Sequence, residues 1–77
     1  MAFLTLNRIK PEALKVGDVI RLDPYDLEIT HIRPCTSARG ETEYVLSTIH
    51  YFFVWPVEGV VRVRADNYVL LKKKGAF

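Results

Sequence analysis

The fold of this chain is decided by residues 44–57, which read Tyr44-Val45-Leu46-Ser47-Thr48-Ile49-His50-Tyr51-Phe52-Phe53-Val54-Trp55-Pro56-Val57. The stretch holds five of the nine aromatic residues of the chain and no Asp, Glu, Lys or Arg. A domain of 77 residues buries only about 60–65% of the surface that its unfolded chain exposes. The stretch is therefore either the core itself or a core strand that also carries a surface for a partner.

The length of this stretch predicts an interruption within it. A straight strand from Glu43 to Val57 would span about 45 Å at roughly 3.3 Å per residue, which is too long for so small a domain. We expect a bend or break near Ser47-Thr48 or around His50. Pro56 is expected to end the run, because proline has no N–H to donate to a neighbouring strand.

Alternation along an extended strand divides the stretch into two faces. One face carries Tyr44, Leu46, Thr48, His50, Phe52 and Val54, and the other carries Val45, Ser47, Ile49, Tyr51, Phe53 and Trp55. Both faces are apolar after His50, and one of them packs on the core. The other face, near Tyr51, Phe53 and Trp55 or near Phe52 and Val54, either contacts a partner or is buried under the N-terminal segment.

Short strands and turns are also predicted before this stretch. Pro at the first helical position and Gly just past the end indicate one turn of helix over residues 11–16. Asp23-Pro24-Tyr25-Asp26 fits a type I turn with proline at its second position. The predicted strands are 3–8, 19–22 and 27–33, the last with Leu27, Ile29 and His31 on one face and Glu28, Thr30 and Ile32 on the other.

Two further segments complete the prediction. Residues 34–42 are polar and are expected to form the longest loop. Residues 59–72 are expected to form a hairpin with the three-residue loop Ala65-Asp66-Asn67, which places Val63 opposite Val69. In that hairpin Val61, Val63, Val69 and Leu71 point inward, and Arg62, Arg64, Tyr68, Leu70 and Lys72 point outward. Five or six short strands predict one small antiparallel all-β barrel over residues 1–77.

One segment resembles a known fold family. Leu14-Lys15-Val16-Gly17-Asp18-Val19-Ile20-Arg21-Leu22, followed by a turn and Glu28-Ile29-Thr30-His31-Ile32, resembles the opening of SH3-like small barrels. The resemblance covers residues 13–33, with the closing hairpin at 59–72 in the matching place. It implies an SH3-like barrel and no single activity, since such barrels bind nucleic acids, ribosomes or peptides. The long aromatic stretch departs from the family pattern.

Composition and cysteine usage limit the possible classes. Charged residues make up 26% of the chain, as in ordinary globular proteins. A single cysteine, Cys35, excludes a disulfide within the chain and favours a reducing, cytoplasmic compartment. The first residues lack the pattern of a signal peptide, and no apolar run is long enough to span a membrane. By analogy of size, the chain suits an accessory protein of a phage or a bacterial operon.

No catalytic or metal-binding pattern is visible in the sequence. Cys35, His31 and His50 lack the glycine-rich turn of a nucleophile site and the paired spacing of a zinc site. The acidic residues between Asp18 and Glu28 do not match a calcium loop, and the four glycines are scattered singly. We therefore expect a non-enzymatic binding module without a cofactor, metal or small-molecule substrate.

Two binding functions follow from the residue pattern. The first is protein–protein interaction or self-association through residues 51–57, with Tyr51, Phe52, Phe53 and Trp55 as contacts, because aromatic residues are common interface anchors. The alternative is nucleic-acid binding through Arg62, Arg64, Tyr68, Lys72, Lys73 and Lys74. Residues 59–77 hold five basic residues and one acidic residue, whereas residues 1–58 hold six and eight. This asymmetry favours an anionic partner for the C-terminal segment.

Overall fold

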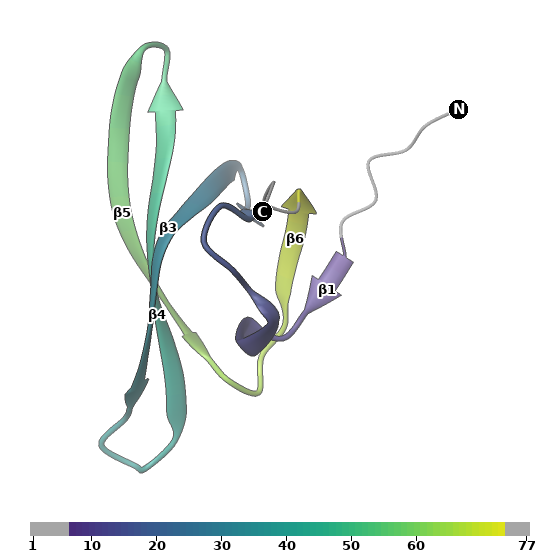
Figure 1. Ribbon diagram of the computed structural model, residues 1–77, viewed down its shortest axis with the longest axis vertical. Coiled ribbons are helices and arrows are strands. Elements are labelled where there is room, and N and C mark those ends of the chain that lie inside the picture. Colours follow the sequence, from purple (N-terminus) through teal and green to yellow (C-terminus); the bar gives the residue numbers. More distant parts are fainter. Residues whose placement is uncertain (1–6, 74–77) are drawn as a thin grey trace.

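The computed structural model describes residues 7–73, which form one six-stranded antiparallel sheet and a short 3-10 turn (Figure 1). The elements are β1 (Asn7–Ile9), η1 (Pro11–Ala13), β2 (Val19–Leu22), β3 (Tyr25–Thr36), β4 (Thr42–Phe52), β5 (Trp55–Arg64) and β6 (Val69–Lys73). The predicted small antiparallel all-β fold with one helical turn near residues 11–16 is confirmed. The expected first strand is seen as β1, and residues 3–6 of that prediction lie outside the described part. Within residues 7–73, no helix is long and apolar enough to cross a membrane.

The sheet coils around one small core. Its strand order is β1-β6-β2-β3-β4-β5, so β1 and β5 are its two edges. Ile9 from β1 and Val61 and Val63 from β5 nevertheless pack against the same cluster. That cluster consists of Leu14, Ile20, Leu27, Ile29, Leu46, Val69 and Leu71, all buried. The two edges therefore curve toward each other, because both must cover the same apolar centre.

The segment before β2 is fixed to β3 by backbone hydrogen bonds. Leu14 donates from its amide to the carbonyl of Pro11, which closes η1 at 3.0 Å. Gly17 has a φ of 96°, a conformation that favours glycine. It donates to the carbonyl of Ile29 at 2.8 Å, and the Ile29 amide donates to the carbonyl of Asp18 at 2.9 Å. The Leu14 side chain is thereby held over the core.

The aromatic stretch folds back on itself as a hairpin. β4 and β5 pair from Glu43 opposite Arg64 to Phe52 opposite Trp55, and Phe53 and Val54 form the turn. The expected break near Ser47-Thr48 or His50 is wrong, since the chain reverses at Phe53, whose φ is 58°. The turn has none of the Gly, Asn or Asp residues that usually mark a two-residue hairpin. Pro56 lies within β5, where an edge strand tolerates it.

The predicted hairpin over residues 59–72 is also wrong. β5 pairs with β4, whereas β6 pairs with β1 and β2. Val63 lies opposite Tyr44 and not opposite Val69. Most of the predicted faces still hold: Val61, Val63, Val69 and Leu71 lie in or against the core, and Arg62, Arg64, Tyr68 and Leu70 are exposed. Lys72, also predicted to point outward, is half-buried beside Asp26. Side-chain alternation is a property of each strand, whereas its partner depends on the whole fold.

β3 is longer than predicted and contains a bulge. It continues through Thr36, so that the loop to β4 begins only at Ser37. Pro34 pairs with Tyr44 on a part of β3 that has no second neighbour among the described strands. The register shifts between Ile29 and His31. The extra residue, Thr30, turns His31 outward and Ile32 toward the core, which reverses the alternation predicted beyond Ile29.

The turn between β2 and β3 lies one residue earlier than predicted. Leu22 pairs with Tyr25, so the turn residues are Asp23 and Pro24. Because Leu22 and Tyr25 are the first and last residues of the turn, Pro24 occupies its third position, and the type I turn predicted over residues 23–26 is not formed. The peptide bond between Asp23 and Pro24 is cis.

One carboxylate ties three neighbouring strands together. Asp26 at the start of β3 accepts hydrogen bonds from Arg21 on β2 and from Lys72 on β6. The hydrogen bond from Arg21, and then that from Lys72, holds the pKa of Asp26 below its ordinary value of 3.8. The same pairing raises the pKa of Arg21. Ionised Asp26 therefore stabilises the junction of β2, β3 and β6.

We expect this junction to stabilise the fold less as the pH falls into the acid range. Because the folded pKa of Asp26 is lowered, its contribution is present above the ordinary value of 3.8 and is lost as the pH falls through the folded pKa. Asp26→Asn should lower Tm at neutral pH, and the difference from the native chain should shrink in acid. Thermal unfolding followed by circular dichroism measures both chains across the pH range. Asp23→Asn, an exposed neighbour, is the control. A Tm difference that stays constant into acid would contradict the assignment.

Candidate functional site

The most distinctive surface is the end of the β4–β5 hairpin. We define the hairpin tip as residues 51–57, all of which are exposed. Phe53 is 80% exposed and Val54 is 79% exposed. In Figure 1 this end of the hairpin projects beyond the neighbouring strands. Side chains of this size normally lie inside a domain, so seven consecutive exposed and uncharged residues form an unusual surface.

Strand pairing arranges the hairpin tip differently from the prediction. Phe52 and Trp55 lie opposite each other and so share one face, while Tyr51 and Pro56 share the other. The predicted grouping of Tyr51, Phe53 and Trp55 on one face is therefore wrong. Phe53 lies in the turn, and its ring meets that of Phe52 edge-on with centroids 4.8 Å apart. The aromatic side chains surround the end of the hairpin, accessible from both sides.

The boundary between core strand and hairpin tip falls at His50. Thr48 is buried, Ile49 and His50 are half-buried, and the next seven residues are exposed. The His50 ring lies 5.1 Å from the ring of Tyr25. The sequence predicted that both faces become apolar beyond His50. Within residues 7–73, no element covers either face of the hairpin tip.

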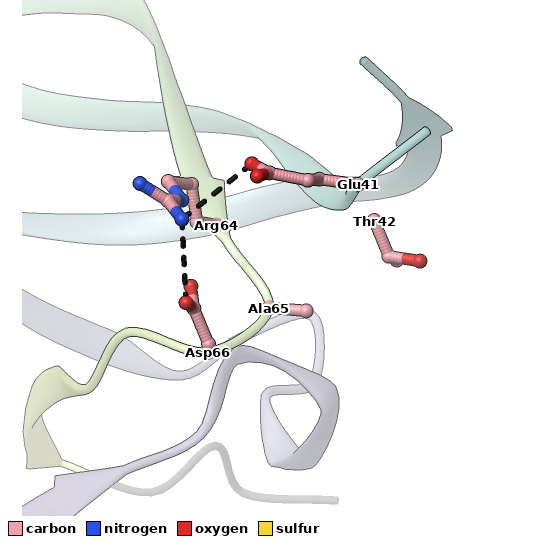
Figure 2. A pocket seen from close by; sticks show the side chains of 5 residues that line it. All are labelled: Glu41, Thr42, Arg64, Ala65 and Asp66. Atoms are coloured by element: carbon pink, nitrogen blue, oxygen red, sulfur yellow. Dashed lines mark hydrogen bonds and ion pairs between the residues drawn. The ribbon is translucent and has the colours of Figure 1, made fainter. Parts of the chain in front are cut away.

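The predicted nucleic-acid residues are distributed over several elements and are largely paired with acids. Arg62 Nε lies 3.6 Å from Glu43 Oε1. The Arg64 side chain lies between those of Glu41 and Asp66 (Figure 2). Its Nη2 is 3.5 Å from Glu41 Oε2 and 3.4 Å from Asp66 Oδ2. These carboxylates offset the positive charge that phosphate binding requires.

The remaining members of this set lie elsewhere. Lys72 contacts Asp26. The ring of Tyr68 is covered by cations, with Lys10 Nζ 4.5 Å and Arg8 Cζ 5.3 Å from its centroid. Lys74 and the side chain of Lys73 lie outside the described part of the chain. Arg62 and Tyr68 line the same cleft, and each described cation of the set has a carboxylate within 4 Å in its own chain.

The remaining candidate groups are also separated. His31 and Cys35 lie on the side of β3 away from the core, whereas His50 lies on the core side of β4. Among residues 7–73, no three His, Cys, Asp or Glu side chains are grouped so that they could hold a metal ion.

The predicted segment 51–57 is exposed throughout, so three residues besides the four named contacts, Val54, Pro56 and Val57, also belong to the surface. The sequence did not place Val54 in the turn at the end of the hairpin. That placement was missed because apolar turn residues resemble a continuing strand.

Comparison of the chain with protein-family models, with curated proteins and with solved structures gave no significant match. The resemblance to SH3-like barrels thus rests on the residues quoted for it.

Proposed function

We propose that this protein is a non-enzymatic interaction module that binds a protein through the hairpin tip. The observation that carries the proposal is the run of seven consecutive exposed, uncharged residues from Tyr51 to Val57. Large exposed apolar patches commonly mark association surfaces, and Trp and Tyr are the residues most often found at binding hot spots. The partner offers an apolar surface, because the hairpin tip has no charged side chain.

The contrast with the rest of the molecule supports this choice. The basic residues of β5 face carboxylates of their own chain, so they give less support to an electrostatic partner. The hairpin tip has no such internal partner within the described residues. Burying it in a complex removes apolar surface from water at about 25 cal/mol per Å².

We expect Trp55→Ala to weaken association by about 30-fold, which corresponds to roughly 2 kcal/mol. The fold should persist, because Trp55 lies outside the core. Sedimentation over a range of concentrations measures self-association. For a partner of another kind, a photoreactive residue at Phe53, compared with one at Val16, should form cross-links in cells that vanish when Trp55 is replaced.

A matched pair of substitutions separates the hairpin tip from general surface effects. Val54→Asp and Val16→Asp make the same chemical change at two exposed valines, one within the hairpin tip and one outside it. Only Val54→Asp should abolish association, since a carboxylate in an apolar contact loses its hydration. If Val54→Asp and Val16→Asp weaken association equally, the hairpin tip is excluded as the interface. The same holds if neither Trp55→Ala nor Val54→Asp weakens association.

A further inference from the structure

We infer that two copies of this chain associate by pairing their β5 strands antiparallel, about a two-fold axis that passes Val60. The inference rests on the proposed function for the role of the hairpin tip and specifies its partner as a second copy. It also involves a different surface, the free edge of β5. Among residues 7–73, β5 pairs with β4 alone. Such an edge is a template for adding another strand.

The unpaired backbone groups of β5 can be assigned. Ala65, directly after β5, donates its amide to the carbonyl of Thr42 at 3.0 Å. Backbone groups of successive residues in an antiparallel strand point to opposite sides. Odd-numbered residues of β5 therefore bond to β4, and even-numbered residues from Pro56 to Arg64 point to the free edge. Pro56 belongs to the edge set, so its missing N–H leaves the bonding to β4 intact.

The charges along this edge select one register. With Val60 opposite Val60, Glu58 of each copy lies opposite Arg62 of the other, and opposite charges directly across a ladder are stabilising. A two-fold axis at Glu58 would instead bring two Glu58 side chains together, and an axis at Arg62 would bring two arginines together. An axis at Val61 would pair Glu58 with Arg64, but Arg64 already lies between Glu41 and Asp66 of its own chain. That axis would also place Val60 opposite Arg62, whereas the register centred on Val60 pairs two valines and joins Glu58 to Arg62. The register centred on Val60 is therefore favoured. It also satisfies the symmetry that dimers of identical chains require.

Both charged residues are accessible for this contact. Glu58 is exposed, and no ion pair joins it to another described residue. The Arg62 side chain is 66% exposed, so it can reach Glu58 of a second copy although its Nε also lies 3.6 Å from Glu43 Oε1 of its own chain. Val60 is 70% exposed, and at the two-fold axis it would be covered by Val60 of the second copy.

The same register gives the hairpin tip an apolar surface to contact. A cleft of about 380 Å³ lies between β5 on one side and β2 and β6 on the other. Leu22, Val63, Tyr68 and Leu70 are among its lining residues. Pairing around Val60 places Val57 of the second copy opposite Val63 and Trp55 of the second copy opposite Ala65. Because opposite residues share a face, Trp55 of the second copy lies on the core side, beside this cleft.

A charge-reversal experiment tests the register. Glu58→Arg and Arg62→Glu each place like charges across the two-fold axis, so each variant alone should dimerise at least about tenfold more weakly than the native chain. An equimolar mixture of Glu58→Arg and Arg62→Glu should form a heterodimer, because residues 58 and 62 then carry opposite charges in both cross-strand pairs. Analytical ultracentrifugation measures each solution. Glu12→Arg and Lys15→Glu carry the same charge changes on exposed residues outside β5 and should leave the dimer intact.

A covalent test remains informative if a charge variant fails to fold. Residues in a hydrogen-bonded antiparallel pair have Cα atoms about 5.5 Å apart, within the range for a disulfide. In a Cys35→Ser background, Val60→Cys should form a covalent dimer under mild oxidation. Val16→Cys, also exposed, should not. Absence of the Val60→Cys dimer would overturn the inference.

The outcomes separate this inference from the proposed function. A native chain that is monomeric at all concentrations, or single charge variants that dimerise as the native chain does, would overturn the β5 pairing. If the cross-links formed in cells from residue 53 still vanish in Trp55→Ala, the hairpin tip remains an interface with another protein. If the mixture rescues the dimer while Trp55→Ala has no effect, the β5 pairing is supported and the hairpin tip is excluded.

Discussion

Leu46→Ala is expected to cost about 2–5 kcal/mol of the free energy of unfolding. Leu46 is fully buried at the centre of β4. It lies opposite Ile32 on β3 and Val61 on β5, so its removal opens a cavity shared by three strands. Domains of this kind are stable by only about 5–15 kcal/mol in total. The substitution should therefore remove a large part of the stability, or unfold the protein near its working temperature.

Urea unfolding followed by circular dichroism measures this loss. Leu22→Ala is the matched control, because it makes the same change on β2 at a side chain that is 51% exposed. Exposed substitutions of this kind usually change stability by less than about 0.5 kcal/mol. Similar midpoints for the two variants would show that Leu46 is not at the centre of the core.

Asp18→Ala is expected to cost about 1–3 kcal/mol, because it removes a buried carboxylate that accepts a partly buried hydrogen bond. Asp18 is 1% exposed. Its carboxylate oxygen Oδ2 accepts from the Lys15 amide at 2.9 Å. Its main chain bonds to Lys15 and to Ile29. The residue thereby joins the turn after η1 to β3, and its loss should loosen the segment that holds Leu14 over the core.

Two related variants define the role of this carboxylate. Asp18→Asn keeps an acceptor oxygen and should lose less stability than Asp18→Ala. Asp23→Ala removes an exposed carboxylate and should have little effect. Amide hydrogen exchange should show faster exchange at Lys15 in Asp18→Ala, since that amide loses its partner. Unchanged exchange at Lys15 would contradict the assigned hydrogen bond.

The buried core and the proposed interaction surface share the same two strands. Leu46 and Thr48 on β4 are buried, and a few residues further the same strand ends in the exposed hairpin tip. The buried half holds the hairpin in place through the core and the ladder with β3. The exposed half presents Trp55 opposite Phe52 at the end of the paired strands. A binding surface on a rigid hairpin loses little conformational entropy when a partner binds.

The burial of individual strands was predictable because their alternation is local. Val61, Val63, Val69 and Leu71 were predicted to point inward, and the structure confirms this although β5 and β6 do not pair. The helical turn at residues 11–13 followed from Pro11 at its start. The excess of apolar side chains beyond His50 was also visible in the sequence. Its exposure on both faces required the structure.

The pairing of the strands was not predictable from the same residues. Backbone N–H and C=O groups are the same in every strand, so the identity of the neighbour carries little local signal. The hairpin over residues 59–72 was favoured because β5 and β6 are adjacent in sequence, whereas the structure places β6 between β1 and β2. The bulge at Thr30 similarly has no marker such as glycine.

By itself, the sequence determined that this protein is a small all-β domain whose aromatic stretch exceeds what its core can bury. This follows from strand alternation and from the high ratio of surface to volume in a short chain. Only the tertiary structure decided that the stretch reverses at Phe53–Val54, that Trp55 lies opposite Phe52, and that β5 has β4 as its one neighbour among the described strands. The physical reason is that strand partners are chosen by how all strands together close around one core.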